Sequence, residues 1–279
     1  MRPHSAPLVV GGLVALAAAC TEFSTVTTGG DAGEELREAS VPDNATSPSV
    51  EASAPEAGAD TSTPRCDEQD LVGRWRLDEG SGTRISDCTS SALVGTLYGG
   101  TWVEGRKGRK ALSFVGGDTG ARIDLGDPAA LKLEGGMTLS AWINVRTVAS
   151  YGRIFAKSAS DGDRGWDLFV DVDGSLDFRV ASGPNDYVFT SLRTFPLGQW
   201  KHVAAVFDPG IAVRLYVDGK VVASTTVGIP AAQRNSTRPA YIGARADCCT
   251  VDGALEDVRI YRRALTATEL DLLFKANGP

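Results

Sequence analysis

Short runs in which apolar and polar residues alternate fill the chain from Cys66 onward, and Gly, Asp and Asn separate them. In the run 137–145 the aliphatic side chains share one face of an extended strand, and Ser140, Trp142 and Asn144 share the other. A period of two indicates a half-buried β-strand. The run 200–207 is apolar on both faces, which is typical of a strand between two layers.

Two Asp-Gly pairs, at 173–174 and 218–219, each join two such runs. The primed turns of two-residue hairpins need positive φ, which Asp and Gly tolerate, so both pairs predict β-hairpins. A single helix is predicted near Thr266, where Thr266 and Glu269 have the spacing of a capping box. The pattern predicts an all-β fold, a two-sheet sandwich or jelly roll with one short C-terminal helix.

The first 19 residues have the features of an export signal. Arg2 and His4 precede an uncharged apolar run that is too short to span a bilayer. The run ends in small residues before Cys20 and resembles the lipobox of bacterial lipoproteins, in which this cysteine is acylated. Here the large aliphatic residue, Leu16, lies four positions before the cysteine and not three. The prediction is a lipid anchor at Cys20, with sorting to the outer membrane, and ordinary cleavage after Ala19 with secretion is the alternative.

Residues 20–65 are rich in Ala, Ser, Thr, Pro, Glu and Asp and contain nine acidic and two basic side chains. Such a segment cannot bury enough apolar surface to offset its chain entropy, which predicts a disordered tether. The remaining domain, 66–279, carries 25 basic and 26 acidic residues. This balance argues against nucleic acid as a partner. The basic run 106–110 fits a solvated turn better than a polyanion site.

Seven motifs in the domain carry a family resemblance. In chain order they are RWRLDEGSGT (74–83), GTLYG (95–99), the segment 105–114, MTLSAW (137–142), GQWKHVA (198–204), LYVDGK (215–220) and GALEDVRIYRRAL (253–265). Over about residues 70–275 the series resembles a laminin-G-like jelly roll of the concanavalin A-like lectin/glucanase superfamily. The resemblance implies two packed antiparallel sheets, one of them concave. Its members include carbohydrate-binding modules, adhesion domains, pentraxins and some glycosidases, so function does not follow from fold.

The chain lacks the carboxylate cluster, commonly Glu-x-Asp-x-x-Glu on one strand, that glycosidases of this fold use. The densest acidic strand holds Asp167, Asp171 and Asp173 but no glutamate, and a polar sheet face with a hairpin explains it. His202 lies inside a predicted strand and is expected to be structural. We therefore predict that the domain is not an enzyme.

Four cysteines, an even number in an exported domain, predict a disulfide framework: Cys66, Cys88, Cys248 and Cys249. Of the three pairings, a bond between Cys66 and Cys88 is favoured, which would tie the entry of the first strand to the loop that follows it. Cys248 and Cys249 would then form a vicinal disulfide or stay reduced. Zinc held by four thiolates is a minor alternative, because a Cys-Cys pair lacks the usual ligand spacing.

Many relatives of this fold carry a calcium ion near the meeting of the first and last strands, and oxygen ligands suit calcium. The residues that the resemblance offers for one structural calcium ion are Asp78, Glu79, Asp87, Glu256 and Asp257. The alternative is that these acids form ion pairs with Arg74, Arg76 and Arg259.

A second group of residues predicts a ligand site at a loop rim, because two sheets packed about 10 Å apart leave no internal cavity. It consists of Asp161, Asp163, Trp166, Asp186 and Tyr187. Trp166 follows Gly165 at the start of a strand, where its ring is either core or a stacking platform.

The resulting prediction is a non-catalytic binding or adhesion module of the cell envelope, with carbohydrate as the leading ligand class. The expected partners are a polysaccharide or glycoconjugate, or another surface protein, with a membrane contacted only through the lipid anchor. Two alternatives remain open, a structural surface protein without a small ligand and a divergent glycosidase-type domain.

Overall fold

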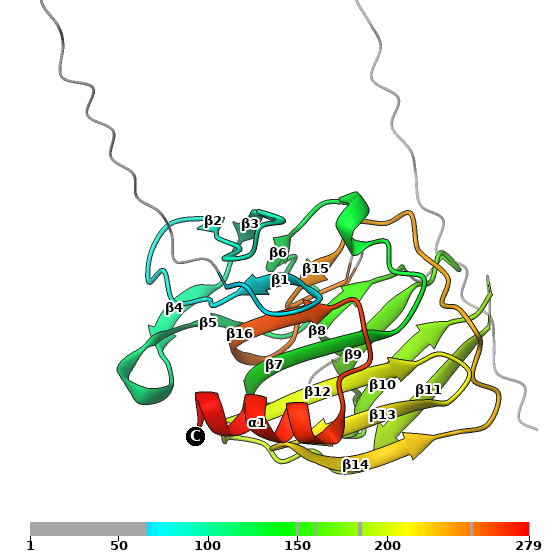
Figure 1. Ribbon diagram of the computed structural model, residues 1–279. Helices are drawn as coiled ribbons and strands as arrows, with labels where there is room; N and C mark the ends of the chain where they lie inside the picture. Colours follow the sequence, from blue (N-terminus) through cyan, green and yellow to red (C-terminus); the bar gives the residue numbers. More distant parts are fainter. Residues whose placement is uncertain (1–65, 149–150, 160, 184–185, 246–247, 279) are drawn as a thin grey trace, which may run out of the picture. The chain divides into compact units, whose positions relative to one another are not determined.

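The structure, a computed structural model, describes residues 66–148, 151–159, 161–183, 186–245 and 248–278 (Figure 1). The predicted signal peptide, the predicted tether and Cys20 lie outside the described residues. Within these ranges, no helix is long and apolar enough to cross a membrane.

Two antiparallel sheets of eight strands each form the domain (Figure 1). The strands of the first sheet are β1 (Leu71–Trp75), β4 (Thr101–Glu104), β5 (Lys110–Phe114), β7 (Met137–Val145), β12 (Lys201–Asp208), β13 (Ala212–Val217), β14 (Lys220–Thr225) and β16 (Gly253–Tyr261). Their order is β14-β13-β12-β7-β16-β5-β4, and β1 pairs with the C-terminal half of β16. The last strand of the chain is therefore central to this sheet.

The second sheet is built from the strands β2 (Arg84–Ile85), β3 (Gly95–Tyr98), β6 (Arg122–Asp124), β8 (Gly152–Lys157), β9 (Trp166–Val170), β10 (Leu176–Ala181), β11 (Tyr187–Leu192) and β15 (Tyr241–Ile242). Their order is β11-β10-β9-β8-β15-β6-β3-β2. Two short 3₁₀ turns, Arg106–Gly108 and Ala129–Leu131, lie in the connections. The two-sheet antiparallel sandwich predicted from the sequence is confirmed.

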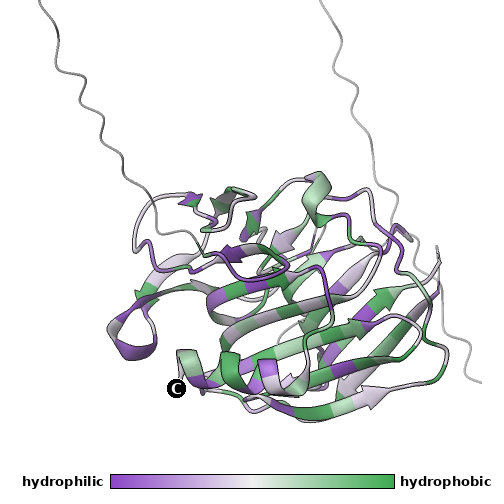
Figure 2. Cartoon of the chain, in the orientation of Figure 1, coloured by the Kyte–Doolittle hydropathy of each residue, from purple (hydrophilic) through white to green (hydrophobic). Residues whose placement is uncertain are grey.

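The core lies between the sheets and is centred on three aromatic rings. Phe155 of β8 lies edge-on to Trp75 of β1, at 5.6 Å between ring centroids, and edge-on to Trp166 of β9, at 4.9 Å. All three side chains are fully buried. Hydrophobic and hydrophilic residues alternate along the strands, as Figure 2 shows, because every second side chain enters this core.

The two Asp-Gly hairpins have different turns. Asp218 and Gly219 both have positive φ, 50° and 75°, and they alone separate β13 from β14, as predicted. Between β9 and β10 five residues, 171–175, form the turn, and only Gly174 in it has positive φ. The predicted hairpin is present, since β9 pairs antiparallel with β10, but its turn is longer than the two residues Asp173-Gly174. The amide of Asp171 pairs with the carbonyl of Ser175 outside the strands.

Helix α1 (Ala267–Asn277) begins with the predicted capping box, in which the Thr266 hydroxyl accepts from the Glu269 amide. It covers part of the outer face of the first sheet (Figure 1). Leu270 packs there in a second hydrophobic cluster with Ala204, Val206, Tyr216, Tyr261 and Leu265. The outer apolar side chains of β12 and β13 are thus buried by the helix.

The predicted disulfide between Cys66 and Cys88 is confirmed, with 5.3 Å between the Cα atoms. The amide of Cys66 also donates to the carbonyl of Cys88 at 2.8 Å. The bond ties the entry of β1 to the segment after β2.

His202 of β12 is the one histidine in the described ranges, and it lies between the sheet and α1. Its ring is 5.4 Å from the ring of Trp142 and 6.2 Å from that of Phe274, measured between centroids. Burial, reinforced by the charge of Arg259, lowers the pKa of His202 from 6.5 to about 4. This histidine is a neutral structural group at neutral pH.

We expect the free energy of unfolding to fall as the pH drops from 6.5 towards 4. In this range the unfolded chain takes up a proton on His202 that the folded chain excludes, whereas above pH 6.5 the imidazole is neutral in both states. The loss at pH 4.5 relative to pH 7 should be about 2 kcal/mol. Urea unfolding of the wild type and His202→Gln at both pH values measures it. Equal pH dependence of the two proteins would contradict the assignment.

Candidate ligand-binding surface

The second sheet presents two cross-strand rows of polar and aromatic side chains on its outer face. The first row, from β11 to β8, is Ser191, Asp177, Phe169 and Arg153. The second row is Phe189, Arg179, Asp167 and Ala156. The residues between them along β9 and β10, such as Leu168 and Phe178, fill the core. Alternation therefore turns both rows away from the core.

Phe169 lies at the centre of this face between two arginines. The guanidinium carbon of Arg153 is 4.0 Å from the centroid of the Phe169 ring, and that of Arg179 is 4.5 Å away. Phe169 is fully buried although it points outward, because the two guanidinium groups cover it. The aromatic ring in turn fixes the position of both cations.

Carboxylates complete the charge balance of the face. Asp167 accepts from Arg153 Nε at 3.4 Å and from the Ser158 hydroxyl at 2.5 Å. Arg179 Nη2 lies 3.8 Å from a carboxylate oxygen of Asp171 and 3.8 Å from one of Asp177. Arg153 is almost completely buried, and burial lowers its pKa, yet an arginine beside a carboxylate keeps its charge.

Two buried polar atoms in these rows have no hydrogen-bond partner among the described residues. They are Oδ1 of Asp177 and Nε of Arg179. Asp177 is only 5% exposed, so its free oxygen carries a desolvation cost that a bound polar group or water would relieve. An unpaired acceptor and an unpaired donor therefore lie close together, buried just beneath this face.

The edge strand β11 places two exposed aromatic side chains near Asp177 and Arg179. Tyr187 is 40% exposed and Phe189 is 51% exposed, and their ring centroids are 6.1 Å apart. The guanidinium carbons of Arg164 and Arg179 each lie 5.3 Å from the Tyr187 ring. We define these four residues together with Asp177 as the β11 surface.

The residues predicted for a ligand site at the loop rim lie in three different places in the structure. They lie at the β11 surface, in the core and in a loop that contacts residues 237–238. The amide of Ala181, the last residue of β10, donates at 2.7 Å to the carbonyl of Gly165, which directly precedes β9. Asp186 is exposed at the turn before Tyr187. Of the predicted rim residues, Tyr187 belongs to the β11 surface and Asp186 precedes it in the chain, whereas Phe189, Asp177 and Arg179 were not among the predicted residues.

Asp161 and Asp163 are held by the opposite loop. Asp161 pairs with Arg238, and Asp163 accepts from the amide and the hydroxyl of Thr237 at 3.0 and 2.6 Å. Burial acts to raise the pKa of Asp163, but the hydrogen bonds from Thr237 hold it below its usual value. Both carboxylates are engaged within the protein, where they position the loop.

A comparison with protein-family models identifies the family of the chain. The model of the concanavalin A-like lectin/glucanases superfamily matches residues 116–271, which is more than half of the chain. The chain belongs to this superfamily. A search of the curated proteins found no match.

Solved structures with the superfamily's fold include toxin binding domains and a domain of a polysaccharide-degrading enzyme. The binding domain of Paraclostridial Mosquitocidal Protein 1 is 18% identical with a TM-score of 0.58, and the match covers 75% of this chain and 52% of that chain. The binding domain of Botulinum Neurotoxin DC in complex with SialylT is 11% identical with a TM-score of 0.57, over 75% and 51% of the two chains. This chain spans about half the length of these toxin binding domains.

Domain 4 of AbnA, a GH43 extracellular arabinanase from Geobacillus stearothermophilus, was solved in complex with arabinotriose. It is 22% identical to this chain with a TM-score of 0.57, and the match covers 74% of this chain and 99% of that domain. At these identities the likenesses establish the fold.

The carboxylates predicted to bind calcium are held apart by other partners in this superfamily member. No three of Asp78, Glu79, Asp87, Glu256 and Asp257, all of them described, bring ligand atoms within 4.8 Å of one another. Asp87 accepts from three backbone amides, those of Arg74, Thr89 and Leu93, at 2.9 Å each. Glu79 accepts from the Ser86 amide, and burial raises its pKa. These two acids shape the loop after β1.

Glu256 and Asp257 bind arginines. Asp257 lies 2.6 Å from Arg74 Nε and 2.8 Å from Arg259 Nη2. Burial acts to raise the pKa of Asp257, but the two guanidinium groups lower it to about 2. Glu256 accepts from Arg106 Nε at 3.0 Å. The donor set does not fit a calcium ion, and the geometry favours the ion-pair alternative.

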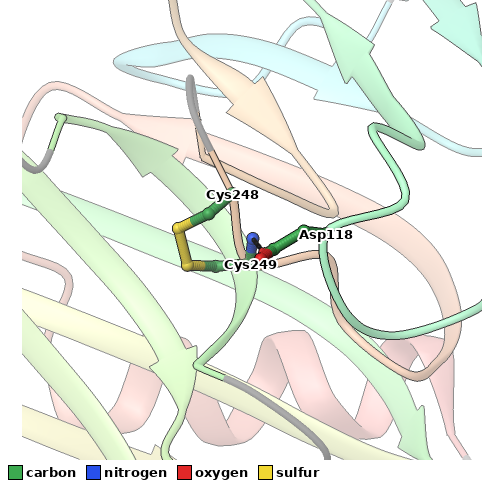
Figure 3. Close-up of side chains that lie close together, drawn as sticks. All are labelled: Asp118, Cys248 and Cys249. Atoms are coloured by element: carbon green, nitrogen blue, oxygen red, sulfur yellow. Dashed lines mark hydrogen bonds between the residues drawn. A yellow bond between two sulfur atoms is a disulfide. The ribbon is translucent and has the colours of Figure 1, made fainter. Parts of the chain in front are cut away.

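Cys248 and Cys249 form a vicinal disulfide near Asp118 (Figure 3). The amide of Cys249 donates to Asp118 Oδ1 at 3.1 Å. Asp118 and the two sulfur atoms form the one group of three metal-ligating side chains in the described ranges. Both sulfur atoms are bonded to each other, so they offer no thiolate to zinc.

The interpretation of Trp166 as a stacking platform is wrong. Its side chain is fully buried against Phe155, because the alternation of β9 sends Trp166, Leu168 and Val170 into the core. We expect Trp166→Ala to lower the free energy of unfolding by about 3 to 5 kcal/mol through the cavity it leaves. Chemical denaturation measures this loss, with exposed Tyr98→Ala as the control, which should change stability far less. A Trp166→Ala protein as stable as the control would contradict the core assignment.

Proposed function

We propose that the domain is a non-catalytic binding module whose β11 surface holds a carbohydrate. The observation that carries the proposal is the pair of exposed rings, Tyr187 and Phe189, beside the unpartnered Asp177 oxygen. The apolar faces of sugar rings stack on aromatic side chains, and sugar hydroxyls pair with charged donors and acceptors. The β11 surface supplies both kinds of contact in one place.

The similar structures support a binding role. Domain 4 of the arabinanase was solved with arabinotriose. The binding domain of botulinum neurotoxin DC was solved with SialylT and also with rat synaptotagmin II. A polysaccharide or glycoconjugate is therefore the proposed partner class. A surface protein as partner is an outcome of the test below.

The arrangement of carboxylates supports a non-catalytic role. Hydrolysis of a glycoside uses two carboxyl groups, one of which donates a proton. On the outer face of the second sheet Asp167 is bound to Arg153, and Asp171 and Asp177 share Arg179. All three carboxylates are thus held by arginines and do not form a free pair of carboxyl groups.

A glycan array compares the wild type with Phe189→Ala and Tyr187→Ala. We expect each substitution to weaken binding of the wild-type ligand at least tenfold while the thermal unfolding midpoint stays nearly unchanged, because both rings are solvent-exposed. The matched control is Tyr98→Ala, since Tyr98 is also exposed and stacked by an arginine, Arg122, but lies on β3.

Three results would count against the proposal. One is the absence of any glycan ligand, as for a structural surface protein. Another is equal loss of binding in the Tyr98 control. The third is release of reducing sugar from the bound glycans, which would make the domain a glycosidase.

We further propose that the protein is exported, anchored through an acylated Cys20 and sorted to the outer membrane. The apolar run and the small residues before that cysteine support the proposal. Mass spectrometry of the mature protein should find an N-terminal Cys20 with the added mass of acyl chains. Cys20→Ser should release the protein from the membrane fraction. An unmodified Cys20 in the mature protein would contradict the anchor and leave secretion as the alternative.

A further inference from the structure

A polar pocket of about 340 Å³ lies on the outer side of the first sheet, where β1, β16 and the turn before β5 meet. It is lined by four cations, Arg74, Arg76, Arg109 and Lys110. The three carboxylates that also line it are Asp78, Glu256 and Asp257. The pocket is thus the place where the sequence predicted a calcium ion, but cations outnumber the acids there.

Two of the three carboxylates are already neutralised from outside the pocket. Asp257 is bound by Arg259 as well as by Arg74. Glu256 is bound by the Arg106 side chain and backbone amide, at 3.0 and 2.5 Å. Neither Arg259 nor Arg106 lines the pocket. Each of these two carboxylates is therefore shared between a cation outside the pocket and one that lines it, Arg74 at Asp257 and Arg109 at Glu256. Lys110 pairs with Glu104, which does not line the pocket.

Arg76 is the least compensated of these cations. Within the described ranges its guanidinium makes one hydrogen bond, from Nη2 to Cys66 Sγ at 3.5 Å, and no carboxylate there lies within 4.0 Å of it. The Nε atom of Arg76 is buried and has no hydrogen-bond partner among these residues. A buried guanidinium donor without an acceptor is an uncompensated cost that an anion would relieve.

Arg109 and Lys110 of the basic run 106–110 form one wall of the pocket. Residues 107–110 are exposed, as expected for a solvated turn, but the first residue of the run is not. Arg106 is only 4% exposed, and its guanidinium carbon lies 3.5 Å from the centroid of a Trp142 ring. This anchor holds the 3₁₀ turn in place, and Arg109 and Lys110 emerge from it towards the pocket. The positions of these two cations are set by the fold.

We propose that this pocket binds a compact oxyanion, the sulfate, phosphate or carboxylate group of a ligand, held by Arg76, Arg109 and Lys110. Guanidinium groups match the planar and tetrahedral oxyanions with paired N–H donors. The pocket belongs to the first sheet and the β11 surface to the second, so this proposal does not depend on the proposed function.

Isothermal titration calorimetry of the full chain at low ionic strength tests the proposal. The probes are sodium sulfate, sodium phosphate and sodium galacturonate, with glucose as the neutral control. We expect saturable binding of at least one oxyanion and none of glucose. Preference for galacturonate would indicate an acidic saccharide, and preference for sulfate or phosphate a tetrahedral group. No binding of any oxyanion would overturn the proposal.

Variants locate the binding. Arg76→Gln should weaken the oxyanion at least tenfold without lowering the unfolding midpoint in probe-free buffer, because Arg76 has no carboxylate partner in the described ranges. Arg109→Gln should also weaken oxyanion binding. Because Arg109 is more exposed, this variant replaces Arg76→Gln in the test if Arg76→Gln fails to fold. The matched control is Arg193→Gln, an exposed arginine just after β11, which should bind as the wild type does. Wild-type affinity in both pocket variants, or equal weakening in the control, would contradict the assignment.

Discussion

The edge-on stack of Trp75, Phe155 and Trp166 is the contact on which the rest of the domain depends. It joins β1 of the first sheet to β8 and β9 of the second, and all three rings are fully buried. Because these buried rings fill the space between the two sheets, no room is left there for a ligand. Any binding by the domain must therefore use the outer faces, the edges or the loops.

The two outer faces have different surroundings. On the first sheet α1 buries the apolar side chains of β12 and β13, and arginine–carboxylate pairs occupy β1 and β16. On the second sheet the described residues include exposed rings on β11 and buried polar atoms without partners on β10. The second sheet thus offers an open surface, whereas the first carries the polar pocket beside Arg76. This difference is the physical basis for assigning a saccharide to the one and an oxyanion to the other.

Local patterns in the sequence were sufficient for much of the fold. Alternation predicted β7 with its bounds, the spacing of Thr266 and Glu269 predicted the start of α1, and Asp218-Gly219 predicted a hairpin. Each of these depends on residues that are close in the chain, and so does the disulfide across 22 residues.

The candidate site depended on partners that are distant in the chain, and the sequence could not supply them. Arg74 and Asp257 are 183 residues apart, and their ion pair decides against a calcium site. Whether Trp166 faces the core or the solvent depends on which side of β9 the other sheet covers. The sequence did contain one signal for the β11 surface. Asp177 and Arg179 are two residues apart, as are Tyr187 and Phe189, and residues two apart on a strand lie on the same face.

The central claim is that the saccharide ligand contacts the outer face of the second sheet around β11. Hydrogen–deuterium exchange of the wild type with and without its strongest glycan-array ligand tests it most directly. We expect the amides of β9, β10 and β11 to exchange more slowly in the complex, while the exchange rates of β1, β16 and α1 stay unchanged. Slower exchange confined to β1, β16 and α1 would contradict it.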